Sequence, residues 1–310
     1  MKPVFRRVEE IPARFGPSVG AIGNFDGVHR GHREILRTLL RLRKPAQRTG
    51  VLTFVNHPSS FLRPGNEPPL ITTLEERVTL LGNSGIDDLY LLPFDAPIAE
   101  LPAEAFVRDV LIDTLRVRAL AVGDNFRFGN GRTGDAALAR ALLEPAGAIV
   151  EAVPPVMEGG ERVSSTRVRA AIVRGDVAEA DALLGHPYAL RGTVVLGEGR
   201  GHSLGFPTAN VAVPAEKTLP ADGVYAAVAR HDGRDYAALV SIGSKPTFGG
   251  TERVIEAWLR DFHRTIYGSE LSLRDLRFVR EQRAFATVDD LLRQMQEDAT
   301  HVQFPSFALI

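Results

Sequence analysis

Two histidines, His29 and His32, lie three residues apart in the run GNFDGVHRGH, which occupies residues 23–32. The run follows a short apolar stretch, residues 19–22, and leads into a helix-like stretch, residues 33–43. A parallel sheet presents backbone N–H groups to phosphates at such a strand-to-helix turn. Glycines let the backbone approach a ligand closely, and imidazoles can donate hydrogen bonds to a phosphoryl group that gains charge. The run therefore predicts a nucleotide site near the N-terminus.

Three further polar segments suit the same site. His57 lies in an Asn-His-Pro turn after the second predicted strand, and Asn125 lies in the turn GDNFRFG after the fourth. The carboxyl ends of parallel strands meet at one rim of a sheet, so we expect these turns to gather there. The run SSTRVR, residues 164–169, opens a helix, and its hydroxyls and arginines suit phosphate binding.

Simpler interpretations of each segment stay open. The two histidines could be a metal pair, but zinc usually takes three or four protein ligands and no second paired cluster stands out. Residues 164–169 could be a helix cap, and His57 and Asn125 could be ordinary turn residues. The sequence contains no GxxxxGK[ST] motif, so a P-loop is excluded.

A second dense run, GRGHSLGFPTAN, occupies residues 199–210. In extended chain, Thr208 and Asn210 point to the same side, and the pair could bind magnesium and a phosphate. Farther along, Glu256 shares one face of a predicted strand with Val254 and Trp258, where a carboxylate suits a general base. The alternatives are a glycine-rich connection between strands and a solvent-facing charge on an edge strand.

The composition excludes several classes of protein. The chain has 310 residues, 44% of them hydrophobic and 24% charged, which predicts two domains with packed cores. A net charge of -1 argues against nucleic-acid binding. The absence of cysteine excludes disulfides, thiolate metal sites and cysteine nucleophiles. Without a signal-like N-terminus or a stretch long enough to span a bilayer, we expect a soluble cytoplasmic protein that binds no membrane.

The elements that must position these residues differ between the two halves. In the first half, strands are predicted at 19–22, 51–55, 89–92, 119–122 and 148–153. Helices are predicted between them at 33–43, 74–83, 103–115 and 135–143, with a capping box at Thr73 and Glu76. This alternation predicts a parallel sheet covered on both faces. Two more helical stretches, 164–172 and 177–184, precede a break at 185–187, which divides the chain into domains 1–186 and 187–310.

The second half predicts a compact antiparallel barrel. Strands are expected at 188–196, 224–230, 235–242, 253–261 and 270–279, without helices between them. The Asp232-Gly233 pair signals a hairpin between two of these strands. A last helix is predicted at 288–301.

Taken together, the N-terminal motifs resemble the bacterial bifunctional riboflavin kinase/FMN adenylyltransferases (FAD synthetases). The resemblance covers residues 18–185. It rests on the His-x-Gly-His motif preceded by Phe-Asp-Gly, on the turn NFRFG and on the run SSTRVR. It implies that an ATP phosphate site contains Gly23, Phe25, Asp26, His29, Gly31, His32, Ser164, Thr166 and Arg169. His57 and Asn125 would contact the flavin nucleotide. The family turn Phe-x-Pro-His-Pro has Asn56 in place of its first proline.

The C-terminal half resembles the riboflavin kinase domain of the same family, over residues 187–300. The matching pieces include LGFPTAN, the strand that carries Glu256, and the Arg-Glu pair at 280–281. The resemblance implies that Thr208 and Asn210 bind Mg²⁺ and ATP, and that Glu256 takes the proton from the 5′-hydroxyl of riboflavin. It also implies ATP contacts for Gly199, Gly205 and Pro207 and a flavin contact for Arg280. Ser241 stands where the family often has Asn.

The fold class implied is a Rossmann-like nucleotidylyltransferase domain with a parallel sheet, followed by an antiparallel β-barrel with a terminal helix. The activities implied are phosphorylation of riboflavin to FMN, with ADP as by-product, and adenylylation of FMN to FAD, with release of pyrophosphate. Both use ATP with Mg²⁺, and the sequence indicates no protein partner. Two alternatives remain: a single activity with the other half as a binding module, and a non-catalytic flavin carrier.

Overall fold

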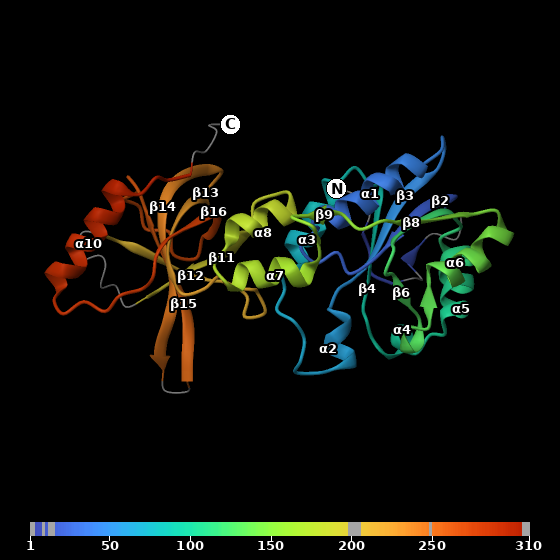
Figure 1. Cartoon of the computed structure of the whole chain (residues 1–310), viewed down its shortest axis with the longest axis horizontal. Coiled ribbons are helices and arrows are strands. Elements are labelled where there is room, and N and C mark those ends of the chain that lie inside the picture. Colours follow the sequence, from blue (N-terminus) through green and yellow to red (C-terminus); the bar gives the residue numbers. More distant parts are fainter. Residues whose placement is uncertain (1–3, 8–9, 12–15, 198–205, 248–249, 306–310) are drawn as a thin grey trace. The chain divides into compact units, whose positions relative to one another are not determined.

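The computed structural model describes residues 4–7, 10–11, 16–197, 206–247 and 250–305. The chain forms two compact units, Met1–Ser165 and Thr166–Ile310 (Figure 1). The division comes earlier than the expected break at 186. Helix α7 (Ser165–Val173) leads into α8 (Val177–Leu184), and α8 contacts strand β16 of the barrel. As a boundary between functional domains, position 186 remains a prediction.

The N-terminal unit is built on a six-stranded parallel sheet with the strand order β1-β4-β3-β2-β5-β8. In chain order, the strands are β1 (Val4–Phe5), β2 (Ser18–Ile22), β3 (Arg48–Phe54), β4 (Asp88–Leu92), β5 (Val117–Gly123) and β8 (Ile149–Val153). All five predicted strands are confirmed. Only β1 was not predicted, because two residues show no hydrophobic period.

The larger helices of this unit are α1 (Arg30–Leu42), α3 (Leu74–Gly82), the π-helix η2 (Phe106–Thr114) after α5 (Ala103–Ala105), and α6 (Ala136–Leu143). The capping box of α3 is confirmed: Thr73 Oγ1 accepts from the Glu76 N–H, and the Glu76 carboxylate accepts from the Thr73 N–H. Helix α1 begins three residues earlier than predicted, at Arg30, so His32 lies inside its first turn.

Shorter elements fill the connections. They are α2 (Pro58–Leu62), α4 (Ala96–Ala99), η3 (Asn130–Arg132), η4 (Glu144–Ala146), and the ribbons β6 (Arg127–Phe128) with β7 (Gly134–Asp135) and β9 (Met157–Glu158) with β10 (Glu161–Arg162). No helix in the described ranges is long and apolar enough to cross a membrane.

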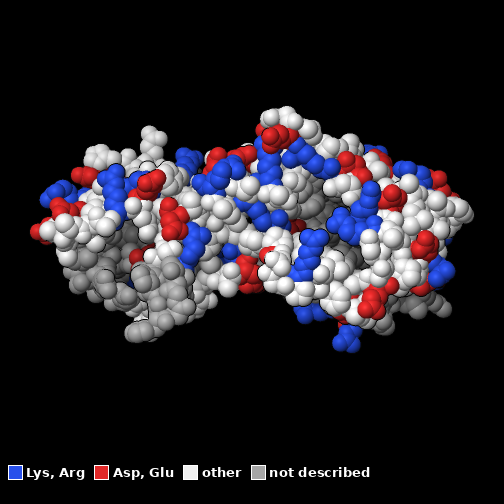
Figure 2. Space-filling model, turned by 60° about the horizontal axis from the view of Figure 1, so that its bottom comes forward, with Lys and Arg blue, Asp and Glu red and all other residues white. Residues whose placement is uncertain are grey.

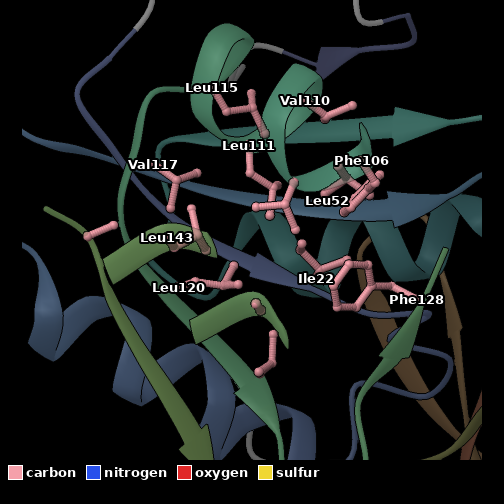
Figure 3. Packing of buried hydrophobic residues seen from close by; sticks show 14 of the residues in the cluster. Ile22, Leu52, Phe106, Val110, Leu111, Leu115, Val117, Leu120, Phe128 and Leu143 are labelled. Atoms are coloured by element: carbon pink, nitrogen blue, oxygen red, sulfur yellow. The ribbon is translucent and has the colours of Figure 1, made fainter. Parts of the chain in front are cut away.

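The parallel sheet buries one hydrophobic layer on each face. On one face, η2 and α6 pack against residues that include Ile22, Leu52 and Leu120 (Figure 3). On the other face, α1 and α3 pack against the alternate residues, among them Ala21 and Val51. The pleat of each strand sends successive side chains into opposite layers. The two layers hold the carboxyl ends of the strands in fixed positions.

The C-terminal unit contains a closed antiparallel barrel with the strand order β11-β12-β15-β14-β13-β16. The strands are β11 (Ala189–Val195), β12 (Thr208–Ala212), β13 (Gly223–His231), β14 (Arg234–Thr247), β15 (Gly250–Leu259) and β16 (Glu270–Arg280), and α10 (Val288–His301) follows. The Asp232-Gly233 hairpin is confirmed, with left-handed φ values of 48° and 76°. The strand β12 was not in the prediction, and α10 has the predicted bounds.

Candidate functional sites

A cavity of about 650 Å³ lies in the N-terminal unit where strands of the parallel sheet end. Gly23 follows β2, Phe54 ends β3, Gly123 ends β5 and Val153 ends β8, and all four line the cavity. The histidine run and the turn that contains Asn125 therefore meet at one rim, as the sequence predicted. Five other predicted site residues also line it: Phe25, His29, Gly31, His32 and Ser164.

The two histidines form a stacked pair at the N-terminus of α1. His29 is the N-cap residue, and its Nδ1 accepts a hydrogen bond of 3.2 Å from the His32 N–H. The ring centroids are 3.6 Å apart and the planes are inclined by 15°. Because Nδ1 is an acceptor, a neutral His29 carries its proton on Nε2, where it can donate to a ligand.

His32 is held in the neutral state. Burial, the neighbouring His29 and the Arg77 guanidinium together lower the pKa of His32 well below its usual value. Its Nδ1 is buried and has no hydrogen-bond partner among the residues that the structure describes. A buried polar atom of this kind beside a cavity is typical of a position that a ligand completes.

The packing around the two histidines explains why the neighbouring positions are occupied by glycine and phenylalanine. A Cβ on Gly31 would lie only 3.1 Å from Cε1 of His29, so a side chain would displace that ring. A Cβ on Gly23 would lie 3.2 Å from the Phe25 ring, which packs against His32 with centroids 5.0 Å apart. Gly23, Phe25 and Gly31 therefore shape the site by their size.

Four of the predicted residues do not line the cavity: Asp26, His57, Thr166 and Arg169. The Asp26 carboxylate is buried and accepts hydrogen bonds from the backbone N–H groups of Ile71 and Thr72. This carboxylate anchors the loop, and its contact with ATP remains a prediction. His57 caps α2, with Nδ1 accepting from the Ser59 N–H at 3.1 Å, and its contact with the flavin nucleotide remains a prediction.

The departure at Asn56 does not loosen this turn. The Asn56 side chain accepts from the Phe94 N–H at 2.8 Å and donates to the Phe94 carbonyl at 3.0 Å. The amide thus pairs with Phe94 as a backbone peptide would. Thr166 and Arg169 lie on α7, in the other compact unit, and their contacts with ATP remain a prediction.

An aromatic wall and a set of arginines were missed by the sequence analysis. Phe126 and Phe128 stack with centroids 5.1 Å apart, and Phe54 meets the edge of Phe94 at the same centroid distance. Four arginines also line the cavity: Arg63, Arg127, Arg132 and Arg162. In the space-filling view, Lys and Arg side chains surround a hollow in this unit (Figure 2). The cavity therefore combines an apolar wall suited to a flat ring with cations suited to phosphates.

The second candidate site lies on one face of the barrel. In the strand register, Asn210 of β12 pairs with Glu256 of β15, and Glu256 pairs with Ser241 of β14. Thr208 pairs with Trp258 on the same face. Directly opposed residues of antiparallel strands have Cβ atoms about 5 Å apart. The predicted pair Thr208 and Asn210 is thus brought beside the predicted base, Glu256.

This face of the barrel is partly open to solvent. The alternate residues of β15 are buried on the opposite side, among them Ile255 and Ala257. Gln282 donates to Ser241 Oγ at 2.9 Å and covers Gly243, where a Cβ would overlap its amide. A Cβ on Gly197 would likewise overlap the Asn210 amide. The sequence did not indicate a role for Gln282, because its partner Ser241 lies 41 positions away along the chain.

Four other predicted residues of this half have different outcomes. The Arg280 guanidinium donates to the buried Asp298 of α10 at 2.7 Å and 2.9 Å, so it is held by an ion pair. Pro207 directly precedes β12 and is exposed. Gly199 and Gly205 lie outside the described residues.

Comparison with known proteins identifies the family of each half of the chain. The family model of FAD synthetase matches residues 12–167, and that of riboflavin kinase matches residues 184–304. The chain belongs to the bifunctional riboflavin kinase/FMN adenylyltransferase family. The family expected from the motifs is therefore confirmed, and with it the fold class of parallel sheet plus antiparallel barrel.

Curated members of the family align along most of the chain. The bifunctional riboflavin kinase/FMN adenylyltransferase of Escherichia coli (strain K12) is 38% identical over 279 residues, which cover 89% of each chain. That of Bacillus subtilis (strain 168) is 34% identical over 287 residues, or 91% of this chain and 90% of the relative. A solved structure from Streptococcus pneumoniae, named a macrolide-efflux protein, has a TM-score of 0.87 and 33% identity and covers 96% of both chains.

Proposed function

We propose that the two units divide the two activities of the family. The barrel transfers the γ-phosphoryl group of ATP to riboflavin, giving FMN and ADP. The N-terminal cavity joins FMN to the AMP part of a second ATP, giving FAD and pyrophosphate. The observation that carries the proposal is that each unit has its own cluster of ligand-binding side chains: the stacked histidines at the sheet rim, and the row Asn210–Glu256–Ser241 on the barrel.

In the N-terminal cavity, a phosphate oxygen of FMN attacks the α-phosphorus of ATP. The bond between the α-phosphorus and the bridging oxygen breaks, and that oxygen leaves with pyrophosphate. Such a transfer depends on positioning and on neutralising charge. His29, with its proton on Nε2, is placed to donate to a phosphate oxygen, and His32 assists as a neutral imidazole. The aromatic wall binds the flavin ring.

The positive charge in this cavity comes from the arginines. Arg162 is ion-paired with Asp124 at 2.5 Å, and Arg127 lies 3.7 Å from Asp135. Arg63 and Arg132 have no ion-pair partner within the described ranges, so their charge is available to phosphates. Asn125 lines the same cavity and is a candidate for orienting the FMN phosphate.

On the barrel, Glu256 takes the proton from the 5′-hydroxyl of riboflavin as that oxygen attacks the γ-phosphorus of ATP. The bond to the β,γ-bridging oxygen breaks and ADP leaves. Thr208 and Asn210 bind the triphosphate with its metal ion. Because Asn210 is the register partner of Glu256, the residue that binds the phosphates lies beside the residue that acts as the base.

Magnesium fits the donor atoms on this face. The Thr208 hydroxyl and the Asn210 amide offer oxygens, which are the ligands that Mg²⁺ prefers. The described part of the chain holds no group of three or more His, Cys, Asp or Glu side chains placed to bind a metal ion. In this proposal, the phosphate oxygens of ATP complete the coordination. When bound, the ion neutralises phosphate charge.

The proposal is tested by separating the two activities. We expect Glu256→Gln to abolish FMN formation from riboflavin while FAD still forms from supplied FMN. We expect His29→Ala to do the opposite. Products are resolved by chromatography after incubation with ATP and Mg²⁺. A parallel loss of both activities in either variant would contradict separate sites. A wild-type chain that forms FMN alone, or neither product, would favour the single-activity or the carrier alternative.

A further inference from the structure

The loop that leads to His29 has a strained backbone. Phe25 has φ of 52° and Val28 has φ of 40°, both in the left-handed region, with Gly27 at 82° between them. A β-branched residue such as Val28 rarely adopts this conformation, because its Cβ crowds the backbone. Such a conformation persists only when the surrounding structure holds it.

The holding contacts come from the segment just before α3. The Thr72 hydroxyl accepts from the Gly27 N–H at 2.9 Å and donates to Asp26 Oδ1 at 3.1 Å. The same carboxylate oxygen accepts from the Thr72 N–H at 2.9 Å. One threonine thus bridges two consecutive residues of the strained loop. It is 5% exposed and does not line the cavity.

Helix α3 provides a second anchor for the same loop. The buried Arg77 donates to the Asn24 carbonyl at 2.9 Å and to the Phe54 carbonyl at 2.7 Å. These contacts fix the start of the loop to the end of β3. Between this anchor and His29, the Val28 N–H donates to the Phe25 carbonyl at 3.0 Å, and the Thr72 hydroxyl bonds the Gly27 N–H.

We propose that Thr72 is a positioning residue for adenylylation. Its hydroxyl keeps Gly27 and Val28 in the conformation that presents the His29 imidazole to the cavity. Without the hydroxyl, the bond from the Gly27 N–H to Thr72 is lost and the strained Val28 can relax towards negative φ, which moves His29. The inference rests on the proposed role of His29. It adds a residue that contacts neither nucleotide.

The structure offers a matched control at the other end of β3. Thr49 is also buried, and its hydroxyl donates to Asp87 Oδ2 at 2.9 Å and accepts from the Asp87 N–H at 3.1 Å. Thr49→Val therefore removes the same kind of threonine–aspartate bridge from the same unit. Thr49 lies near the amino end of β3, and the cavity lies at the carboxyl end.

The experiment compares Thr72→Val, Thr72→Ser and Thr49→Val in the full chain. We expect Thr72→Val to lower kcat for FAD formation from FMN about a hundredfold, because small displacements of a catalytic group have effects of that size. The KM values for ATP and FMN should stay within about threefold, since ground-state contacts are kept. Thr72→Ser, which retains the hydroxyl, should keep a kcat close to that of the unaltered chain. Riboflavin kinase activity in the same samples should be unchanged.

Three results would overturn the inference. The first is a wild-type kcat in Thr72→Val, and the second is a loss in Thr72→Ser as large as that in Thr72→Val. The third is an equal loss of kcat in Thr49→Val, which would mean that any threonine–aspartate bridge in the unit has the same effect. If the unaltered chain formed no FAD from FMN, the proposed function itself would fail, and this inference with it.

Discussion

The imidazole rings of His29 and His32 lie face to face, with their centroids 3.6 Å apart. Residue 31 is a glycine, and the absence of a side chain there leaves room for the His29 ring. The stack, the cap bond from the His32 N–H and the close approach of Gly31 leave His29 little freedom to rotate. The position of its Nε2 is therefore set by the start of α1.

Gly31→Ala tests this arrangement directly. The added Cβ would lie 3.1 Å from Cε1 and 3.2 Å from Nδ1 of His29, so the ring must move. We expect kcat for adenylylation to fall at least about tenfold, with riboflavin kinase activity unchanged. Gly82→Ala is the control, because nothing lies within 4 Å of a Cβ at that helical position. Full adenylylation in Gly31→Ala would show that the position of the His29 ring is unimportant.

On the barrel, Gly197→Ala should act through Asn210. A side chain at 197 would overlap the Asn210 amide and displace it. Because Asn210 is proposed to bind the triphosphate with its metal ion, we expect the KM for ATP in FMN formation to rise about tenfold. FAD formation from FMN serves as the internal control. An unchanged KM would argue that Asn210 does not bind ATP.

Asp181 should make the C-terminal unit less stable as the pH rises. Burial raises the pKa of Asp181 to about 7, aided by the nearby Asp275 and opposed by the hydrogen bond from the Tyr188 N–H. Between the usual 3.8 and about 7, the folded state therefore binds a proton that the unfolded state lacks. Stability then falls as pH increases across this interval and levels off above it.

Asp181→Asn removes this titration. We expect the variant to be more stable than the unaltered chain at pH 8 and to lose the decline between pH 5 and pH 7. Trp258, the single tryptophan, lies on β15 and reports unfolding of the barrel by its fluorescence. Parallel pH profiles for the two proteins would contradict the assignment.

The ion pair of Arg280 with Asp298 should hold α10 against the barrel. The two side chains are 15% and 7% exposed, and Gln294 also donates to Asp298. Asp298→Ala leaves a buried guanidinium without its partner, so we expect the barrel to lose about 3 kcal/mol of stability. Denaturant unfolding followed by Trp258 fluorescence measures the loss. A change below about 0.5 kcal/mol would place Arg280 among ordinary surface cations.

The sequence predicted most elements because their hydrophobic period is strong. It placed α1 three residues late, since the cap is a histidine ring nitrogen and not one of the usual side chains. The strand β12 was hidden because it follows a run of glycines and a proline that is typical of loops. The π-helix η2 could not be anticipated, because it depends on bonds such as that from the Leu115 N–H to the Val110 carbonyl.

In the candidate sites, too, some features were predictable from the sequence and others were not. The turns at strand ends could be predicted to meet, because the carboxyl ends of parallel strands lie at the same rim of a sheet. Charged residues were harder to assign, since a carboxylate such as Asp26 or a guanidinium such as Arg280 can bind a ligand or anchor the chain. The structure shows that Thr72 and Asp298 hold these two side chains, and the sequence does not indicate either partner. The phenylalanines of the aromatic wall, Phe54, Phe94, Phe126 and Phe128, were not predicted as site residues because each also fits a hydrophobic core.

The strand register on the barrel also limits how this protein can change its length. A one-residue insertion in β15 before Glu256 would turn the carboxylate into the barrel interior, because successive side chains alternate between faces. A two-residue insertion would keep the face but carry the carboxylate about 7 Å away from Asn210. Length variation should therefore be confined to the loops, and riboflavin phosphorylation can serve as a direct assay for correct strand pairing in any redesigned barrel.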